Sequence, residues 1–202
     1  MFASDTPPLA PPPHLGLLPK DGARCALVVI DIQERLLPHI AGHESALTHA
    51  VQAVALARRL GIPILALEQY RKGLGDTVPA LREALAQADA PPPIEKRAFS
   101  PFGEPGFPKA LHALTPAPQH LILCGIETHV CVLQTALDAR AQGLGTYLIA
   151  DATGSRDPAH AALAQQRMRD AGTRIGAIEM LAFELLRTAA HPAFQDIRRI
   201  IL

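Results

Sequence analysis

The sequence contains no tryptophan, few aromatic residues and no excess of charge of either sign. Aromatic residues make up 4% of its 202 residues, and 19 basic side chains balance 19 acidic ones. Proteins that bind nucleic acid usually carry a basic excess, and those that stack bases need aromatic side chains. We therefore expect no nucleic-acid partner. We also expect no membrane partner, because no apolar run approaches the roughly 20 residues of a membrane-spanning helix.

Cysteine is also scarce, and only Cys25, Cys124 and Cys131 are present. A low, odd number of cysteines in a chain of this length is typical of a reducing compartment, which predicts a cytoplasmic protein. Their spacing matches no zinc motif, so we expect no metal. We expect no other cofactor either. Cys25 and Cys124 lie inside apolar runs and are expected in the core, which leaves Cys131 as the candidate for chemistry.

Alternating strands and helices predict one α/β domain. Prolines are frequent in residues 1–22, which we expect to form an extended N-terminal arm, and residues 23–202 form the domain. Apolar runs predict strands at 24–30, 62–67, 94–98, 121–124, 146–150 and 173–179. Helical spacing predicts helices at 44–60, 79–87, 108–114, 128–142, 158–171, 180–188 and 192–201. We expect α/β/α layers around a central, mainly parallel six-stranded sheet, Rossmann-like with strand order 3-2-1-4-5-6.

Cys131 lies in the opening turn of the helix predicted at 128–142, directly after a strand. The first N–H groups of a helix have no intrahelical partner, and the helix dipole places partial positive charge there. Both effects favour a thiolate, and such positions can lower the pKa of a cysteine to roughly 3.5–7.5. An ordinary buried cysteine fits the same position, since free cysteine often packs as a small apolar residue.

Asp31 and Lys96 occupy comparable places in the predicted sheet. Asp31 follows the first strand and Lys96 belongs to the third, so both are expected at the edge where α/β folds place their ligands. An acid, a cation and a thiol together make an activated nucleophile, because the carboxylate takes the thiol proton and the ammonium stabilises the thiolate. Taken singly, Asp31 also fits a turn cap and Lys96 a solvated charge.

These three residues lie in three distinctive segments, VVIDIQERL, IEKRAFSPF and LCGIETHVCVLQTALDARAQG. Together the segments resemble the isochorismatase-like cysteine hydrolases, and the resemblance runs from about residue 24 to residue 184. Three further segments resemble the branch typified by isochorismatase domain-containing protein 2, namely EQYRKGLGDTVPAL, ALAQQRMRDAG and AAHPAFQDIRRII.

The resemblance implies a catalytic triad of Asp31, Lys96 and Cys131. It also implies a cis peptide between Ile126 and Glu127, an oxyanion hole formed by the amides of Glu127 and Cys131, and a homo-oligomer. The implied reaction is hydrolysis of a non-peptide C–N bond in a small amide, through a thioester on the cysteine. The substrate is then a small molecule of unknown identity.

Further side chains flank the three catalytic positions and are candidates for the substrate pocket: Gln33, Leu36, Gln69, Tyr70, Phe99, Phe102, Glu127 and His129. The apolar ones fit ordinary core packing equally well. His129 fits the pocket or the opposite side of its helix, since residues two apart do not share a helix face. Nicotinamidases of the family hold a metal with an Asp-x-His motif and a second histidine after strand two. This chain has EQYRKGLGD there, without histidine, which argues against that metal.

Three other functions remain open. One is a non-catalytic binding or assembly protein that keeps the pocket. Another is an isochorismatase-type hydrolase that cleaves a vinyl ether and forms no thioester. The third is a thiol redox role, which would need Cys124 to face Cys131 because the chain has no CxxC pair.

Overall fold

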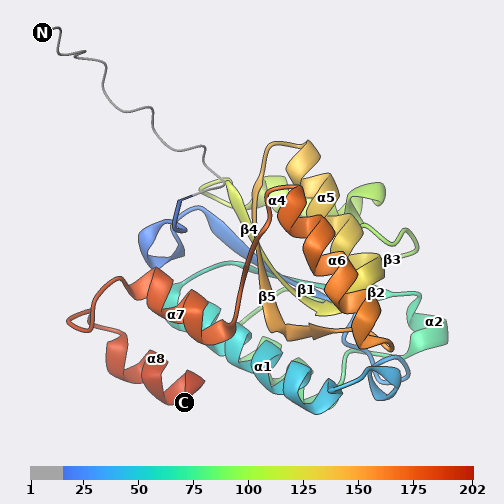
Figure 1. The fold of residues 1–202 in the computed structure, drawn as a ribbon, viewed down its shortest axis with the longest axis horizontal. Helices are drawn as coiled ribbons and strands as arrows, with labels where there is room; N and C mark the ends of the chain where they lie inside the picture. Colours follow the sequence, from blue (N-terminus) through green and yellow to red (C-terminus); the bar gives the residue numbers. More distant parts are fainter. Residues whose placement is uncertain (1–15) are drawn as a thin grey trace, which may run out of the picture.

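A parallel sheet with strand order β3-β2-β1-β4-β5-β6 forms the centre of the protein (Figure 1). The computed structural model describes residues 16–202, so most of the arm predicted at 1–22 lies outside the described residues. Every strand pairs in parallel with its neighbours. The fold class and the strand order are therefore confirmed. The strands are β1 (Cys25–Ile30), β2 (Ile64–Gln69), β3 (Ile94–Lys96), β4 (His120–Ile126), β5 (Gly145–Gly154) and β6 (Arg174–Gly176).

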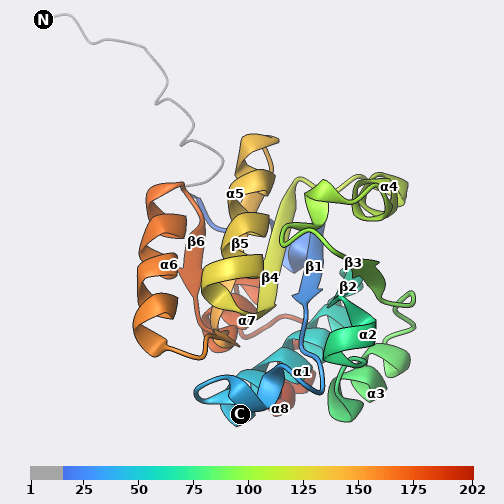
Figure 2. The same cartoon turned by 90° about the vertical axis from the view of Figure 1, so that its right-hand side faces the viewer.

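Helices cover both faces of the sheet (Figures 1 and 2). Successive strand side chains point to opposite faces, so Leu27 and Val29 enter one core cluster while Val28 and Ile30 enter the other. The first cluster is covered by α1 (His43–Leu60), α3 (Pro79–Gln87), α7 (Ile178–Leu186) and α8 (Phe194–Ile201). The second is covered by α4 (Gly106–Ala113), α5 (Leu133–Ala141) and α6 (Pro158–Asp170). Short 3-10 turns are η1 (Lys20–Gly22), η2 (Leu37–His39) and η3 (Pro101–Gly103). Within residues 16–202, no helix has the length and apolar character to cross a membrane.

The N-terminal part of the described chain packs against α7. Leu18 is fully buried in the core. Its N–H donates to Glu184 Oε1 at 2.5 Å, and its carbonyl accepts from Arg187. Asp21 is bound by His191, whose Nε2 lies 2.6 Å from Asp21 Oδ1. The packed domain therefore includes residues on the N-terminal side of position 23.

The carboxyl ends of four strands meet at one edge of the sheet. Ile30 pairs with Gly125 of β4, and Gln69 at the end of β2 pairs with Lys96 at the end of β3. Gly125 does not end the strand, as its glycine had suggested, because β4 continues through it to Ile126. A Cβ at Gly125 would lie 2.1 Å from the Ile30 carbonyl oxygen, so only glycine allows this approach.

Three local elements differ from the prediction. A short helix, α2 (Arg71–Leu74), occupies the loop expected after β2. The helix predicted at 128–142 begins as a π-helical turn, η4 (Thr128–Val132), before α5 starts. β5 extends four residues beyond its predicted end, because a register shift lets Thr153 and Gly154 pair with the end of β4. Each difference depends on tertiary contacts that apolar spacing does not encode.

Candidate active site

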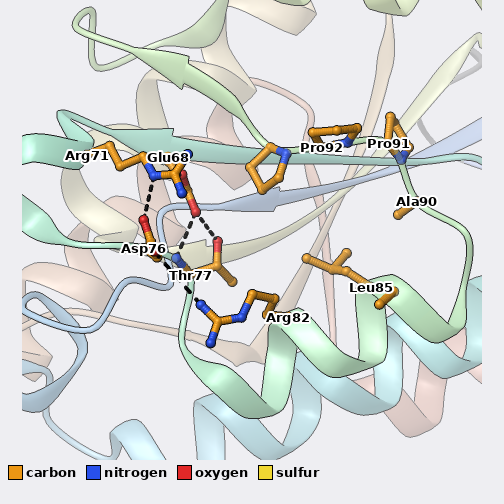
Figure 3. A pocket seen from close by; sticks show the side chains of 11 residues that line it. Glu68, Arg71, Asp76, Thr77, Arg82, Leu85, Ala90, Pro91 and Pro92 are labelled. Atoms are coloured by element: carbon orange, nitrogen blue, oxygen red, sulfur yellow. Dashed lines mark hydrogen bonds and ion pairs between the residues drawn. The ribbon is translucent and has the colours of Figure 1, made fainter.

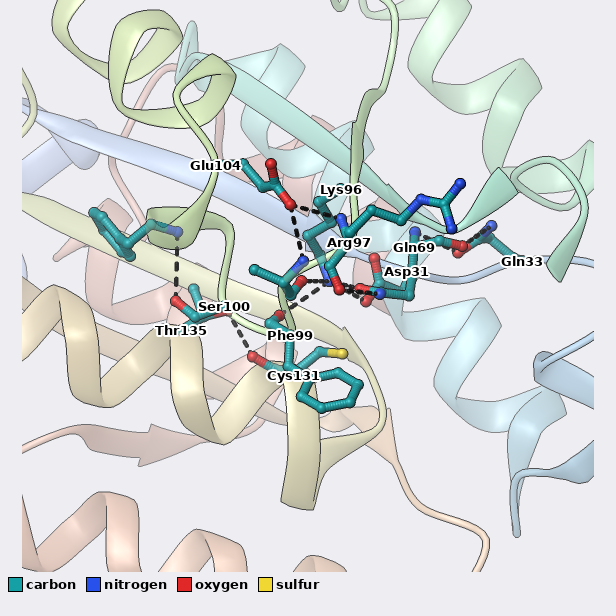
Figure 4. A network of polar contacts seen from close by, with 12 residues as sticks. Asp31, Gln33, Gln69, Lys96, Arg97, Phe99, Ser100, Glu104, Cys131 and Thr135 are labelled. Atoms are coloured by element: carbon teal, nitrogen blue, oxygen red, sulfur yellow. Dashed lines mark hydrogen bonds and ion pairs between the residues drawn. The ribbon is translucent and has the colours of Figure 1, made fainter. Parts of the chain in front are cut away.

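Asp31 and Lys96 form a fully buried ion pair at this edge (Figure 4). Lys96 Nζ lies 2.7 Å from Asp31 Oδ2, and both side chains are 0% exposed. The ammonium also donates to Gln69 Oε1 at 2.6 Å and to the Phe99 carbonyl at 3.0 Å, with the Ala98 carbonyl at 3.4 Å. The three protons of the ammonium are thus bound by protein acceptors. Lys96 therefore acts as a fixed positive charge on Asp31.

Gln69 and Gln33 hold that charge in place. Gln69 Nε2 donates to the Arg97 carbonyl at 2.7 Å, which directs its Oε1 toward Lys96. Gln33 bridges two segments: its Nε2 donates to the carbonyls of Gln69 and Gly75, and its Oε1 accepts from the Gln69 N–H at 2.8 Å. Both were expected to line a pocket. The structure instead places Gln69 against Lys96 and uses Gln33 to support the surrounding backbone.

Cys131 lies in the π-helical turn after β4 and is 6% exposed. The Val132 N–H donates to the Glu127 carbonyl at 3.3 Å, and the Thr135 hydroxyl donates to the Cys131 carbonyl at 2.6 Å. The Ile126–Glu127 peptide that precedes the turn is cis, as the family resemblance implied. Figure 4 shows the Cys131 side chain on the side of the turn that faces Asp31 and Lys96.

The surroundings of Cys131 favour the protonated thiol. Burial raises its pKa to about 12, the charge of Asp31 adds to this, and Lys96 acts in the opposite direction. The sequence had led us to expect a lowered pKa from the helix N-terminus, but burial and the carboxylate outweigh that effect. Any attack by this thiol would therefore require that it lose its proton.

Asp31 is placed to receive that proton. Burial raises its pKa, while the charge and hydrogen bond of Lys96 and a hydrogen-bonding interaction with Cys131 lower it. Asp31 Oδ1 is buried, and no group of residues 16–202 makes a geometrically complete hydrogen bond to it. A carboxylate oxygen with a free lone pair thus lies beside a protonated thiol, which is the arrangement that base-assisted nucleophilic attack requires.

Glu127 and His129 bind the loop that follows β5. Glu127 is buried and accepts hydrogen bonds from the backbone and the guanidinium of Arg156. His129 Nδ1 lies 2.9 Å from Ser155 Oγ, and its ring is 5.1 Å from that of His160. The sequence left open which way His129 points, and the structure shows its side chain directed toward Ser155 and α6. A groove of about 340 Å³ adjoins it, lined by His129, Leu133, His160, Leu163, Ala164 and Arg167.

The remaining pocket candidates occupy different surroundings. Phe99 and Tyr70 are exposed, and the Arg97 guanidinium lies 4.1 Å from the Tyr70 ring centroid. Phe102 packs edge-to-face on a buried phenylalanine of α4, within the cluster that contains Cys131. Leu36 packs against the cluster on the α1 face, whereas Cys131 belongs to the opposite face. Phe102 thus lies on the Cys131 side of the sheet, and Figure 4 shows Phe99 beside Cys131, whereas Leu36 lies on the opposite side.

A second polar cavity of about 220 Å³ lies beside β2, and its charges are mutually satisfied (Figure 3). Glu68 Oε1 accepts from the N–H and the hydroxyl of Thr77, both at 2.7 Å. Arg71 binds Asp76 at 2.5 Å and lies 3.5 Å from Glu68. Among the residues that the structure describes, no group of three or more His, Cys, Asp or Glu side chains could hold a metal ion.

Arg156 and Ser155 were not found from the sequence. Both directly follow β5, and the carboxyl end of that strand lies at the same edge as Asp31. Asp31 was selected because it follows the carboxyl end of a strand, and the same criterion would have selected Arg156 and Ser155. It failed here because β5 was expected to end at residue 150, four residues too early.

Comparisons with known proteins show the family and the fold. Residues 25–180 match the isochorismatase domain. Isochorismatase domain-containing protein 2A of Mus musculus is 38% identical over 175 residues, which cover 87% of this chain and 81% of the relative. The structure of the MAR1 ribonuclease from Caenorhabditis elegans superposes with a TM-score of 0.80 at 35% identity and covers 88% of each chain. The ycaC gene product of Escherichia coli, described as an octameric hydrolase of unknown specificity, shares the fold with a TM-score of 0.78 at 24% identity. The match covers 92% of this chain and 94% of that one. The matched region contains the segments around Asp31, Lys96 and Cys131, so the chain belongs to the isochorismatase domain family.

Proposed function

We propose that the protein is a cysteine-dependent hydrolase that cleaves the C–N bond of a small amide through a thioester intermediate. The observation that supports this most is the pairing of a protonated, buried Cys131 thiol with the open oxygen of Asp31. The other oxygen of that carboxylate, Asp31 Oδ2, lies 2.7 Å from Lys96 Nζ. Within residues 16–202, Asp31 Oδ1 makes no geometrically complete hydrogen bond, so it can accept the proton of the neighbouring thiol.

The first half-reaction forms the thioester. Asp31 Oδ1 takes the proton of Cys131 as the sulfur attacks the amide carbonyl carbon, and the carbonyl oxygen becomes an oxyanion. The amides of Glu127 and Cys131 donate to that oxyanion; one such donor is worth about 3–4 kcal/mol of barrier. The C–N bond then breaks, and the proton held by Asp31 passes to the leaving amine.

The second half-reaction releases the acid. Asp31, again a carboxylate, takes a proton from water as the water oxygen attacks the thioester carbon. The C–S bond breaks, and the proton returns from Asp31 to the sulfur, which regenerates the thiol. Lys96 takes no part in proton transfer, because its protons are bound by Asp31, Gln69 and the Phe99 carbonyl. Its charge keeps Asp31 ionised between the two steps.

Mass spectrometry of an acyl-enzyme tests this proposal. The protein is mixed with p-nitrophenyl acetate and with a panel of small primary amides, quenched in acid and mapped by peptide. We expect an acyl group on Cys131 and its loss in Cys131→Ala, with an unchanged melting temperature. Absence of any acyl group on Cys131 in the wild-type protein would overturn the thioester mechanism.

The name of the C. elegans structure supplies a second candidate function, cleavage of RNA. The balanced charge of this chain argues against a polyanion substrate. A fluorescent RNA substrate separates the two functions: cleavage that survives in Cys131→Ala would show a reaction that does not use this site. We further propose that the protein assembles as a homo-oligomer, because Leu163, Met180 and Phe183 expose apolar surface on α6 and α7.

A further inference from the structure

Two loops at the site edge are tied together by the buried carboxylate of Glu127. The Arg156 N–H donates to Glu127 Oε2 at 3.0 Å, Arg156 Nη2 donates to Oε1 at 2.9 Å, and Nε lies 3.1 Å from Oε2. Burial would raise the pKa of Glu127, but the hydrogen bonds of Arg156 outweigh it and lower the pKa. The carboxylate is therefore ionised and held in a two-pronged fork, the most directional of side-chain ion pairs.

A second hydrogen bond joins the same two segments. His129 Nδ1 is 2.9 Å from Ser155 Oγ, and Ser155 is buried. The Ser155 carbonyl in turn accepts from the Ala41 N–H at 3.1 Å, which anchors this loop to the segment before α1. Two side chains, Glu127 and His129, thus connect the turn that carries Cys131 to a loop that is itself anchored.

The Arg156 side chain is 63% exposed, whereas that of Glu127 is 8% exposed. An ion pair with one exposed partner adds little to stability, since water competes for the guanidinium. The two-pronged ion pair instead fixes the orientation of the Glu127 carboxylate. The Glu127 carboxylate is bound by both the main chain and the side chain of Arg156, which restricts the orientation of Glu127 relative to the loop after β5.

We propose that Arg156 is a positioning residue that holds the Glu127 turn so that its amides meet the oxyanion. This inference rests on the proposed thioester mechanism. Misplacement of catalytic donors by about 1 Å can cost about a hundredfold in rate. Loss of Arg156 should therefore slow the step that forms an oxyanion and leave the thiol itself unaffected.

Two reactions of Cys131 separate these effects. Acylation by p-nitrophenyl acetate passes through an oxyanion, whereas alkylation by iodoacetamide is a displacement at a methylene carbon and forms none. Both rates are measured at Cys131 by peptide mapping, for the wild type, Arg156→Ala, Glu127→Ala and the double variant. Arg71→Ala is the matched control, because Arg71 is 57% exposed beside Glu68, whose side chain is 5% exposed.

We expect Arg156→Ala to acylate about 10–100-fold more slowly and to alkylate at the wild-type rate. The double variant should be no slower than Glu127→Ala, because the two residues act as one unit. Arg71→Ala should match the wild type in both reactions. Equal losses in acylation and alkylation, or unchanged acylation in Arg156→Ala, would overturn the positioning role. A wild-type protein that is alkylated but never acylated would instead overturn the thioester mechanism on which the role rests.

Discussion

Asp31 and Glu68 are both buried carboxylates near the ends of neighbouring strands, and each lies beside a basic side chain. Glu68 adjoins a cavity of about 220 Å³, yet Thr77 and Arg71 satisfy its oxygens. Asp31 adjoins a thiol and has an oxygen that lacks a complete hydrogen bond within the described chain. Our proposal therefore places the chemistry at the carboxylate that lies beside a thiol and has an open acceptor, and not at the one that adjoins a cavity.

The two carboxylates also differ in the exposure of their cations. Lys96 is 0% exposed, whereas Arg71 is 57% exposed. Charges buried together interact strongly and lose their hydration, so removing one partner leaves the other in an environment that penalises it. Water screens the pair at Glu68, so the loss of Arg71 is compensated by solvent. The comparison thus predicts very different costs for the same kind of substitution.

Lys96→Met should have the largest effect on stability. It leaves Asp31 as an unpaired buried carboxylate, and breaking such a pair costs about 3–5 kcal/mol. Burial already raises the pKa of Asp31, and loss of Lys96 removes an influence that lowers it. The folded variant then binds a proton more tightly than the unfolded chain, so its stability should rise as pH falls toward the ordinary aspartate pKa. Urea unfolding at pH 7 and pH 5 measures both effects.

The double variant Asp31→Asn/Lys96→Met is the control for that experiment. It removes both charges, so it should be more stable at pH 7 than Lys96→Met alone while remaining inactive. A Lys96→Met protein as stable as the wild type at pH 7 would break the comparison, since it would mean that Asp31 is compensated by something other than Lys96.

Asp31→Asn should have the next largest effect, on rate. An amide cannot accept the thiol proton, and general bases contribute about 10²–10⁴-fold. We expect acylation of Cys131 by p-nitrophenyl acetate to fall by at least about a hundredfold. Glu68→Gln is the matched substitution at the other carboxylate and should acylate at the wild-type rate. Equal losses in the two variants would show that Asp31 has no special role.

Glu68→Ala tests the structural carboxylate directly. It removes the acceptor for the N–H and hydroxyl of Thr77, and an unsatisfied buried polar group costs about 1–3 kcal/mol. We expect the low end of that range, because water can enter from the adjoining cavity. Glu68→Gln should recover most of the loss, since its amide oxygen still accepts. Thermal unfolding of both variants, with Cys131 alkylation unchanged, would sharpen the comparison.

The sequence predicted the sheet and the meeting of its strand ends well. Continuous apolar runs predicted the strands, and the strand order expected was that of a Rossmann-like fold. A parallel sheet brings the carboxyl ends of its strands to one edge, which placed Asp31 near Lys96. These inferences need only local patterns and the handedness of the fold. The cis peptide before Glu127 and the family itself came from motif resemblance, which carries information that periodicity does not.

Side-chain directions and the thiol pKa could not be read in the same way. Leu36 packs against the cluster on the α1 face and His129 contacts Ser155, and these directions depend on loop conformation. The pKa of Cys131 is raised because burial and Asp31 outweigh the helix end, and burial is a tertiary property. Gln69 was expected to meet substrate, yet it binds Lys96 at 2.6 Å. That contact depends on the register of β2 with β3, which no pattern of apolar residues specifies.

Arg71→Ala should have the smallest effect and completes the comparison with Lys96→Met. Glu68 keeps both bonds from Thr77, so the variant loses only screened contacts. The hydrogen bond of Arg71 lowers the pKa of Asp76. The stabilisation from the Arg71–Asp76 pair is therefore fully present above the ordinary aspartate pKa. It is lost as the pH falls through the lowered pKa of Asp76. The small difference in melting temperature between wild type and variant should close at acid pH and in high salt, whereas the Lys96→Met deficit should persist in salt because its charges are buried. If Arg71→Ala lowered the melting temperature as much as Lys96→Met does, and salt did not change this loss, the exposure of the cation would not explain the difference between the two ion pairs.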